Sequence, residues 1–153
     1  MQIEEVREFI SNTSAETKIY IGADSERFKK KNVWYATFTV AVVVHYDGCS
    51  GCKVFGDVST ERDIDQKSNK PFHRMMMETY KASAIYLELA EAIGDRHVEI
   101  HLDINPSELH GSNVALAAAI GYVRGVCNII PMVKPNAPIA SYCADRLREI
   151  IKC

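Results

Sequence analysis

The segment Lys18–Ser25 most constrains the fold, because it has the pattern of a short buried strand that leads directly to a carboxylate. Every second residue from Ile19 to Ala23 is apolar, which is the period-two pattern of a strand. Gly22 allows another backbone or a ligand to come close to the end of this strand. A turn-capping role is the alternative for Asp24, but an acid at the C-terminal tip of a core strand is also well placed for a functional site.

The length and composition of the chain are those of one ordinary domain. Its 153 residues predict a single domain over residues 1–153, with enough chain to bury a substantial core. The chain is 47% hydrophobic and 25% charged, and no apolar run approaches the roughly 20 residues that a membrane span requires. The acidic start Met1–Glu5 does not resemble a secretory signal, so we expect a cytoplasmic protein without a membrane span.

Cysteine usage and charge restrict the possible partners. The five cysteines are irregularly spaced, as in reduced cytosolic proteins, and only Cys49 and Cys52 form a close pair. That pair is either half of a zinc site or simply the tip of a hairpin. The net charge of −2 argues against a protein that coats nucleic acid through bulk positive charge. Local contact with phosphate remains open, because Lys29–Lys31 and the Lys67/Lys70 pair are compact basic patches on predicted loops.

The remaining hydrophobic periodicity predicts an α/β fold. Three strands form an antiparallel meander, and two further strands alternate with helices. After a short N-terminal helix at residues 3–10 and the first strand, the predicted elements are strands 33–44 and 53–58, helix 71–93, strand 97–103, helix 113–126, strand 129–133 and helix 140–151. The prediction is therefore a five-stranded mixed sheet, three antiparallel strands followed by two parallel ones, flanked by helices, with an extra N-terminal helix.

Glu78 is the one acid on the apolar stripe of the long helix at 71–93. At 100° per residue, the apolar side chains from Met75 to Ile93 fall within about 80° of Glu78, whereas Glu88 and Glu91 point away. A buried, unpaired carboxylate costs several kcal/mol unless a cation or hydrogen-bond donors meet it. We therefore expect Glu78 to meet either a neighbouring cationic or polar side chain or a functional site.

A second predicted strand also ends in an acid. The segment from His97 to Asp103 alternates strictly, with Asp103 last, and the turn Asn105-Pro106 follows. A right-handed crossover would place this strand parallel to the first, with Asp24 and Asp103 at the same edge. Glu78, on the crossover helix, would then face both acids. Asp145 lies on the polar side of the last helix, so its local pattern predicts a solvent-exposed residue.

With this order of elements, the chain resembles the ribonuclease H-like superfamily and, within it, the YkuK-type family of predicted nucleases. The resemblance covers almost the whole chain from Lys18 onward. It is carried by Gly22-Ala23-Asp24-Ser25, Arg74-Met75-Met76-Met77-Glu78, His101-Leu102-Asp103-Ile104-Asn105, Gly121-Tyr122-Val123-Arg124-Gly125 and Ser141-Tyr142-Cys143-Ala144-Asp145-Arg146.

The resemblance implies that Asp24, Glu78, Asp103 and Asp145 form a four-acid site and that the start of the last helix faces it. Four clustered carboxylates need divalent cations, and oxygen ligands favour two Mg²⁺ or Mn²⁺ ions. The implied activity is hydrolysis of phosphodiester bonds in RNA or DNA by a two-metal mechanism.

Four further residues are candidate substrate contacts, and one loop of the sequence departs from the pattern of the family. The candidates are Ser25, Asn105, Lys134 and Asn136. Many ribonucleases H carry a His in the loop before the last helix, but residues 134–139 contain none.

Two alternative functions remain open at this stage. The first is a ribonuclease H-like module without catalytic activity that binds nucleic acid or a protein partner. The second is a hydrolase using Ser112, His110 and Asp103, which the absence of a GxSxG motif disfavours. A Walker phosphate loop is also absent, and the sequence gives no indication of oligomeric state.

Overall fold

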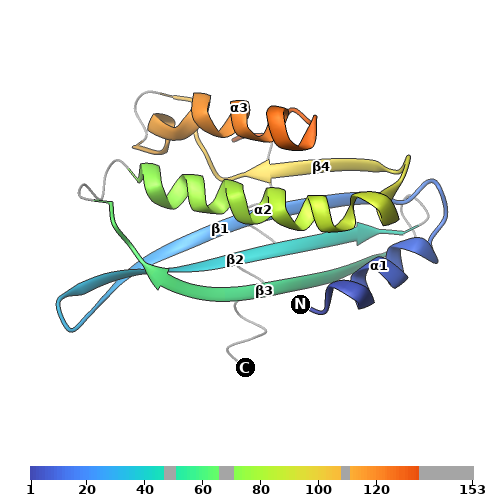
Figure 1. Cartoon of the computed structure of the whole chain (residues 1–153), viewed down its shortest axis with the longest axis horizontal. Helices are drawn as coiled ribbons and strands as arrows, with labels where there is room; N and C mark the ends of the chain where they lie inside the picture. Colours follow the sequence, from blue (N-terminus) through green and yellow to red (C-terminus); the bar gives the residue numbers. More distant parts are fainter. Residues whose placement is uncertain (47–50, 66–70, 108–110, 135–153) are drawn as a thin grey trace.

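The structure is a computed structural model that describes residues 1–46, 51–65, 71–107 and 111–134. Within these ranges the chain forms a sheet and three α-helices (Figure 1). In chain order the elements are α1 (Ile3–Ser11), β1 (Lys18–Lys30), β2 (Val33–His45), β3 (Cys52–Arg62), α2 (Phe72–Ile93), β4 (His97–Leu102), the 3₁₀ helix η1 (Gly111–Ala115) and α3 (Leu116–Cys127). None of the helices in the described ranges is long and apolar enough to span a bilayer.

The sheet has the strand order β3-β2-β1-β4. β1, β2 and β3 form the predicted antiparallel meander, and β4 lies parallel to β1. Residues 18–23 of β1 pair with residues 97–102 of β4. The predicted crossover through the long helix is therefore confirmed, and the first and fourth strands run side by side in the same direction (Figure 1).

One face of the sheet carries the hydrophobic core. The odd-numbered residues of β1, such as Ile19 and Ile21, meet apolar side chains of all three α-helices. α2 lies across the sheet, with α1 and α3 beside it (Figure 1). Leu89 on α2 is fully buried, and burying a side chain of this kind contributes about 1.5–3 kcal/mol. The core thus fixes the rotation of α2, which decides where its polar residues point.

β1 is longer than the sequence pattern predicts, and this corrects the position of Asp24. The strand continues through the charged stretch after Asp24 as far as Lys30, whereas we expected a turn there. The extension pairs with the start of β2 without a bulge, closed by Lys31 and Asn32 at φ values of 50° and 63°. Two consecutive positive φ angles are typical of a two-residue type I′ hairpin. Charged side chains can extend into solvent from a paired backbone, so polarity alone did not end the strand.

Two other boundaries differ from expectation. β3 continues to Arg62 rather than ending at residue 58, because the polar residues 59–62 pair with residues 35–38 of β2. The fifth strand predicted at residues 129–133 is not confirmed, since the described residues form a four-stranded sheet. Met132 makes a single parallel bridge to His101 of β4, with Pro131 immediately before it. The helix predicted at 113–126 begins as η1 and continues as α3, and the helix predicted at 140–151 lies outside the described residues.

Candidate active site

Asp24 and Asp103 lie at the point where the parallel ladder between β1 and β4 stops. The last paired residues are Ala23 and Leu102, so the two acids occupy the next position on each chain. Asp24 is only 7% exposed, and its Oδ1 accepts a hydrogen bond of 2.8 Å from the backbone N–H of Ser25. The expected meeting of the two acids at one edge is thus consistent with the register. Asp24 itself is in the middle of β1, at the end of the ladder and not at the end of the strand.

Glu78, on α2, lies within electrostatic reach of these acids. Its side chain is 1% exposed, and neither carboxyl oxygen has a hydrogen-bond partner within the described part of the chain. Burial and then the negative charge of Asp24 raise the pKa of Glu78 well above its usual value, and Asp103 adds to this rise. The nearby Ser25 hydroxyl and the Arg74 guanidinium lower the pKa, but to a smaller extent. The pKa of Glu78 on α2 therefore responds to the charges of Asp24 in β1 and of Asp103, which follows directly after β4.

Arg74 connects the start of α2 to β1. Its Nη1 donates hydrogen bonds to the carbonyl and the hydroxyl oxygen of Ser25, at 3.1 Å and 3.0 Å. The candidate substrate contact Ser25 therefore has a structural partner. The role of Arg74 was not predicted from the sequence, although its spacing of four residues from Glu78 places both side chains on one face of the helix.

Asp65 fixes the first turn of α2. Its Oδ1 accepts the backbone N–H of His73 at 2.7 Å, and its Oδ2 accepts that of Arg74 at 3.1 Å. A carboxylate in this place satisfies amide groups that have no partner inside the helix and interacts favourably with the helix dipole. Asp65 was not predicted as a cap because it lies outside the helix, in the chain segment that precedes it.

Lys134 brings a positive charge to the acids. Its Nζ lies 2.6 Å from Asp103 Oδ1, and its backbone N–H donates to the carbonyl oxygen of Ile104 at 3.0 Å. The hydrogen bond with Asp103 raises the pKa of Lys134, and the charges of Asp24 and Glu78 add to this effect despite some burial. Lys134, a candidate substrate contact, forms an ion pair with Asp103 in this structure.

The other predicted site residues are only partly accounted for. The Asn105 Oδ1 accepts the backbone N–H of Ser107 at 2.9 Å, which is a local turn. Asp145 and Asn136 lie outside the described residues, as do His110 and the side chain of Ser112 from the alternative hydrolase reading. Among the side chains that the structure describes, no three His, Cys, Asp or Glu residues are close enough together to hold a metal ion.

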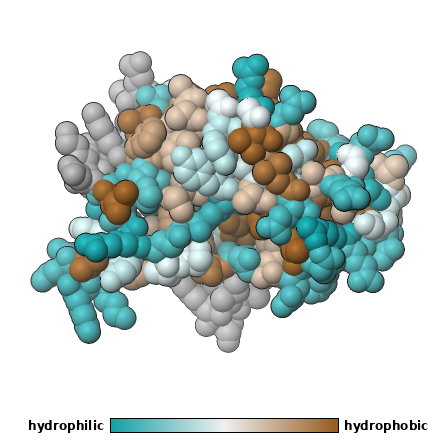
Figure 2. All heavy atoms as spheres, viewed as in Figure 1, coloured by the Kyte–Doolittle hydropathy of each residue, from teal (hydrophilic) through white to brown (hydrophobic). Residues whose placement is uncertain are grey.

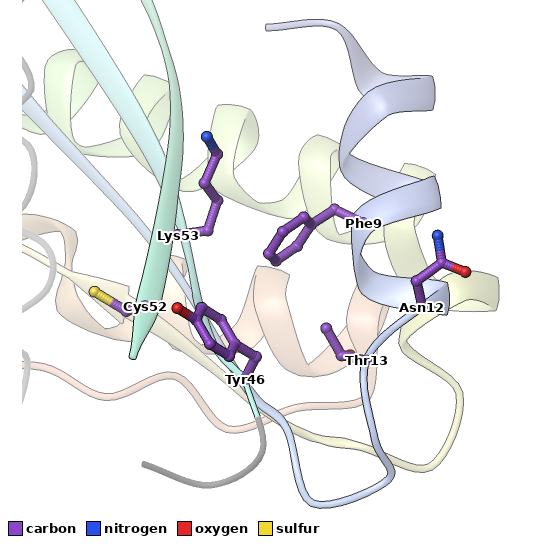
Figure 3. A pocket seen from close by; sticks show the side chains of 6 residues that line it. All are labelled: Phe9, Asn12, Thr13, Tyr46, Cys52 and Lys53. Atoms are coloured by element: carbon purple, nitrogen blue, oxygen red, sulfur yellow. The ribbon is translucent and has the colours of Figure 1, made fainter. Parts of the chain in front are cut away.

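The cysteine pair gives no metal site in the described residues either. Cys49 is outside them, and Cys52 is an exposed free thiol. Cys52 and Tyr46 line a hollow of about 400 Å³ between the sheet and the end of α1, together with Phe9 and Lys53 (Figure 3). None of the candidate acids lines this hollow.

Two histidines of β4 flank a further acid, Glu99. His97 Nε2 lies 2.6 Å from Glu99 Oε2, and His101 Nε2 lies 3.1 Å from Glu99 Oε1. Burial would raise the pKa of Glu99, but these contacts outweigh that effect and leave the pKa below its usual value. Both carboxylate oxygens of Glu99 therefore have histidine partners within β4.

One of the comparisons with known proteins agrees with this architecture. No similarity was found to a curated protein or to a solved structure. A family model described as ribonuclease H-like matches residues 2–149, and the chain therefore belongs to the ribonuclease H-like family.

Proposed function

We propose that the protein is a nuclease that requires divalent metal ions and hydrolyses phosphodiester bonds in RNA or DNA. Membership of the ribonuclease H-like family suggests a nuclease or another function related to nucleic acid. The observation that carries the proposal is Glu78, a fully buried carboxyl group without a hydrogen-bond partner among the described residues. Burial and the negative charges of Asp24 and Asp103 raise its pKa.

The chemistry of these side chains suits Mg²⁺ or Mn²⁺. Both ions prefer carboxylate oxygens, which Asp24, Glu78 and Asp103 supply. Asp24, Glu78 and Asp103, with Asp145 from the last predicted helix, would hold two ions. When bound, such ions activate a water molecule and stabilise the leaving oxygen during in-line displacement at phosphorus.

The residues around the acids have supporting roles in this proposal. Arg74 holds Ser25 through two hydrogen bonds and thereby keeps the strand next to Asp24 in place. A metal ion held by Asp103 would replace Lys134 as the partner of this carboxylate, and the Lys134 ammonium would then be available to a phosphate group of the substrate. The assignment to the YkuK-type family and a cytoplasmic location are further proposals, the first of which rests on the five sequence motifs quoted above.

Two measurements test the proposal. Mg²⁺ or Mn²⁺ should raise the melting temperature of the wild type, and Asp24→Asn should remove that increase, whereas the exposed Asp95→Asn should not. Labelled single-stranded, duplex and hybrid substrates should be cleaved in Mn²⁺ by the wild type and by Asp95→Asn but not by Asp103→Asn. Cleavage that survives Asp103→Asn would indicate a contaminating enzyme and refute the assignment.

A ribonuclease H-like module without catalytic activity is the second candidate. The ion pair between Lys134 and Asp103 favours it, because this pair neutralises one acid without any metal. Binding of nucleic acid with no thermal response to divalent ions and no cleavage would support this alternative.

A further inference from the structure

The tip of the β1–β2 hairpin, residues 28–35, is a basic surface at one end of the sheet. It carries three consecutive lysines, Lys29, Lys30 and Lys31, and no acid, although the whole chain has a net charge of −2. All three lysines are exposed, and they form no ion pair with another described residue. The hairpin tip extends away from the helices (Figure 1), and hydrophilic side chains cover it at the left of Figure 2.

Aromatic rings accompany these charges. Phe28 is 36% exposed and stacks on Tyr35, with ring centroids 5.6 Å apart and planes 21° from parallel. Both rings line a shallow groove of about 410 Å³, together with Lys30, Lys31 and Thr60. Stacked rings beside ammonium groups suit a ligand that has flat rings and negative charges.

The groove opens on the same face of the sheet as Asp24. Phe28 and Asp24 are four residues apart on the continuous strand β1, and side chains separated by an even number of residues share a face. At about 3.3 Å per residue, the two positions are about 13 Å apart along the strand. A nucleic acid strand that occupies the groove would have to span only about four stacked nucleotides to reach Asp24.

The opposite face holds the hairpin tip in place. Arg27 forms an ion pair with Asp63, and its guanidinium lies 3.9 Å from the ring centre of Trp34. The Asp63 N–H donates to the Trp34 carbonyl oxygen at 3.0 Å. These residues already have structural partners. The groove residues on the other face are therefore the ones available to a ligand.

We propose that the hairpin tip binds single-stranded nucleic acid, with bases stacked on Phe28 and Tyr35 and phosphates beside Lys30 and Lys31. Single strands fit best because bases inside a duplex stack on one another and expose only their edges. This inference rests on the proposed function, since it describes how the substrate of the acidic site would be held.

Binding in EDTA tests the hairpin tip without involving metal or cleavage. Fluorescence anisotropy with labelled oligothymidylate and oligouridylate should show binding to the wild type that weakens with salt. In Lys30→Gln/Lys31→Gln the plot of log K for binding against the log of the salt concentration should have a slope that is shallower by about 1.4. Each of the two lost phosphate contacts contributes about 0.7 to this change. Phe28→Ala should weaken binding at least about fivefold and leave the salt slope unchanged.

Matched controls separate these effects from a general loss of charge or stability. Lys18→Gln removes an exposed lysine from the same face at the other end of β1, and Leu87→Ala removes an exposed apolar side chain of α2. Both should bind like the wild type. Melting curves show whether Phe28→Ala stays folded, and the double lysine variant preserves the aromatic stack in any case.

Several results would overturn the inference. The first is that the hairpin variants bind the oligonucleotides as tightly as the wild type does. The second is that the wild type binds a blunt duplex as tightly as a single strand. The third is that it binds polyglutamate as tightly as a single strand, which would point to an acidic protein partner. A failure of the binding proposal for the hairpin tip can be distinguished from a failure of the proposed nuclease activity. If Asp103→Asn abolishes cleavage but the hairpin variants bind oligonucleotides like the wild type, only the proposal for the hairpin tip is refuted. If binding depends on the hairpin but no cleavage occurs, only the proposed nuclease activity is refuted.

Discussion

Glu78→Met should stabilise the metal-free protein, although it removes a residue of the proposed active site. Glu78 is 1% exposed, and its two oxygens lack hydrogen-bond partners in the described ranges. Met has a similar length and fills the same space between α2 and the sheet without a polar group. The substitution therefore removes an unfavourable buried group and leaves the core packed.

The size of the gain follows from the cost of the buried group. A buried polar group without a partner costs about 1–3 kcal/mol, and repulsion from Asp24 and Asp103 adds to this cost when Glu78 is ionised. For a protein of this size, each kcal/mol corresponds to roughly 2–4 °C in melting temperature. We expect Glu78→Met to melt at least several degrees higher than the wild type in EDTA at neutral pH.

The pH dependence of the gain distinguishes the carboxyl group from a simple packing effect. The pKa of Glu78 is raised in the folded state, so between the unfolded value near 4.5 and the raised value the folded protein binds more protons than the unfolded protein. The stability of the wild type therefore falls as the pH rises through this range. The advantage of Glu78→Met should be smallest near pH 4 and should grow towards neutral pH.

Urea denaturation in EDTA at several pH values measures this difference. Glu91→Met, on the exposed side of the same helix, is the matched control and should show no such pH-dependent gain. With added Mn²⁺ the order should reverse, because only the wild type retains the full set of metal ligands. A Glu78→Met protein that is less stable than the wild type at neutral pH in EDTA would refute the reasoning.

Three further predictions concern residues around the site and in the core. Lys134→Gln should lower the free energy of unfolding in EDTA by about 1 kcal/mol or less, because the ammonium is partly exposed. The same substitution frees Asp103 and should therefore lower the Mn²⁺ concentration needed to raise the melting temperature. Leu89→Ala should lower the free energy of unfolding by about 2–5 kcal/mol in urea denaturation, since the side chain is fully buried. Glu99→Gln should be less stable than the wild type at neutral pH. Because hydrogen bonds with two histidines, acting against burial, lower the pKa of Glu99, the difference should shrink as the pH falls below about 4.5 in acid titrations followed by circular dichroism.

The sequence was sufficient to predict how α2 is oriented. Its apolar stripe has a helical period, and the rotation that buries Leu89 and Ile93 also buries Glu78. Gly94, with a φ of 56°, ends the helix where it was predicted to end. Periodicity sufficed here because a long helix has only one rotation that buries its whole apolar face.

The partners of the acids could not be predicted in the same way. Lys134 reaches Asp103 because residues near Met132 run beside β4, which depends on long-range pairing rather than on local pattern. Asp65 caps α2 from the segment before the helix, and Arg74 spans from α2 to β1. Such contacts join segments far apart in the chain, so residue spacing within one element does not reveal them.

Asp24 lies within β1 and not at its end, and this position determines what surrounds the acid. β4 ends at Leu102 while β1 continues to Lys30, so beyond Ala23 no described strand pairs with β1 on the side of β4. The pairing with β4 therefore ends beside Asp24, although the strand that carries this acid is uninterrupted. A side chain on a paired strand is held more precisely than one on a loop. Because the same strand continues to the hairpin tip, the spacing between Asp24 and the Phe28 groove is fixed by the β1–β2 pairing. A nuclease built in this way should require a minimum length of single strand rather than a particular sequence.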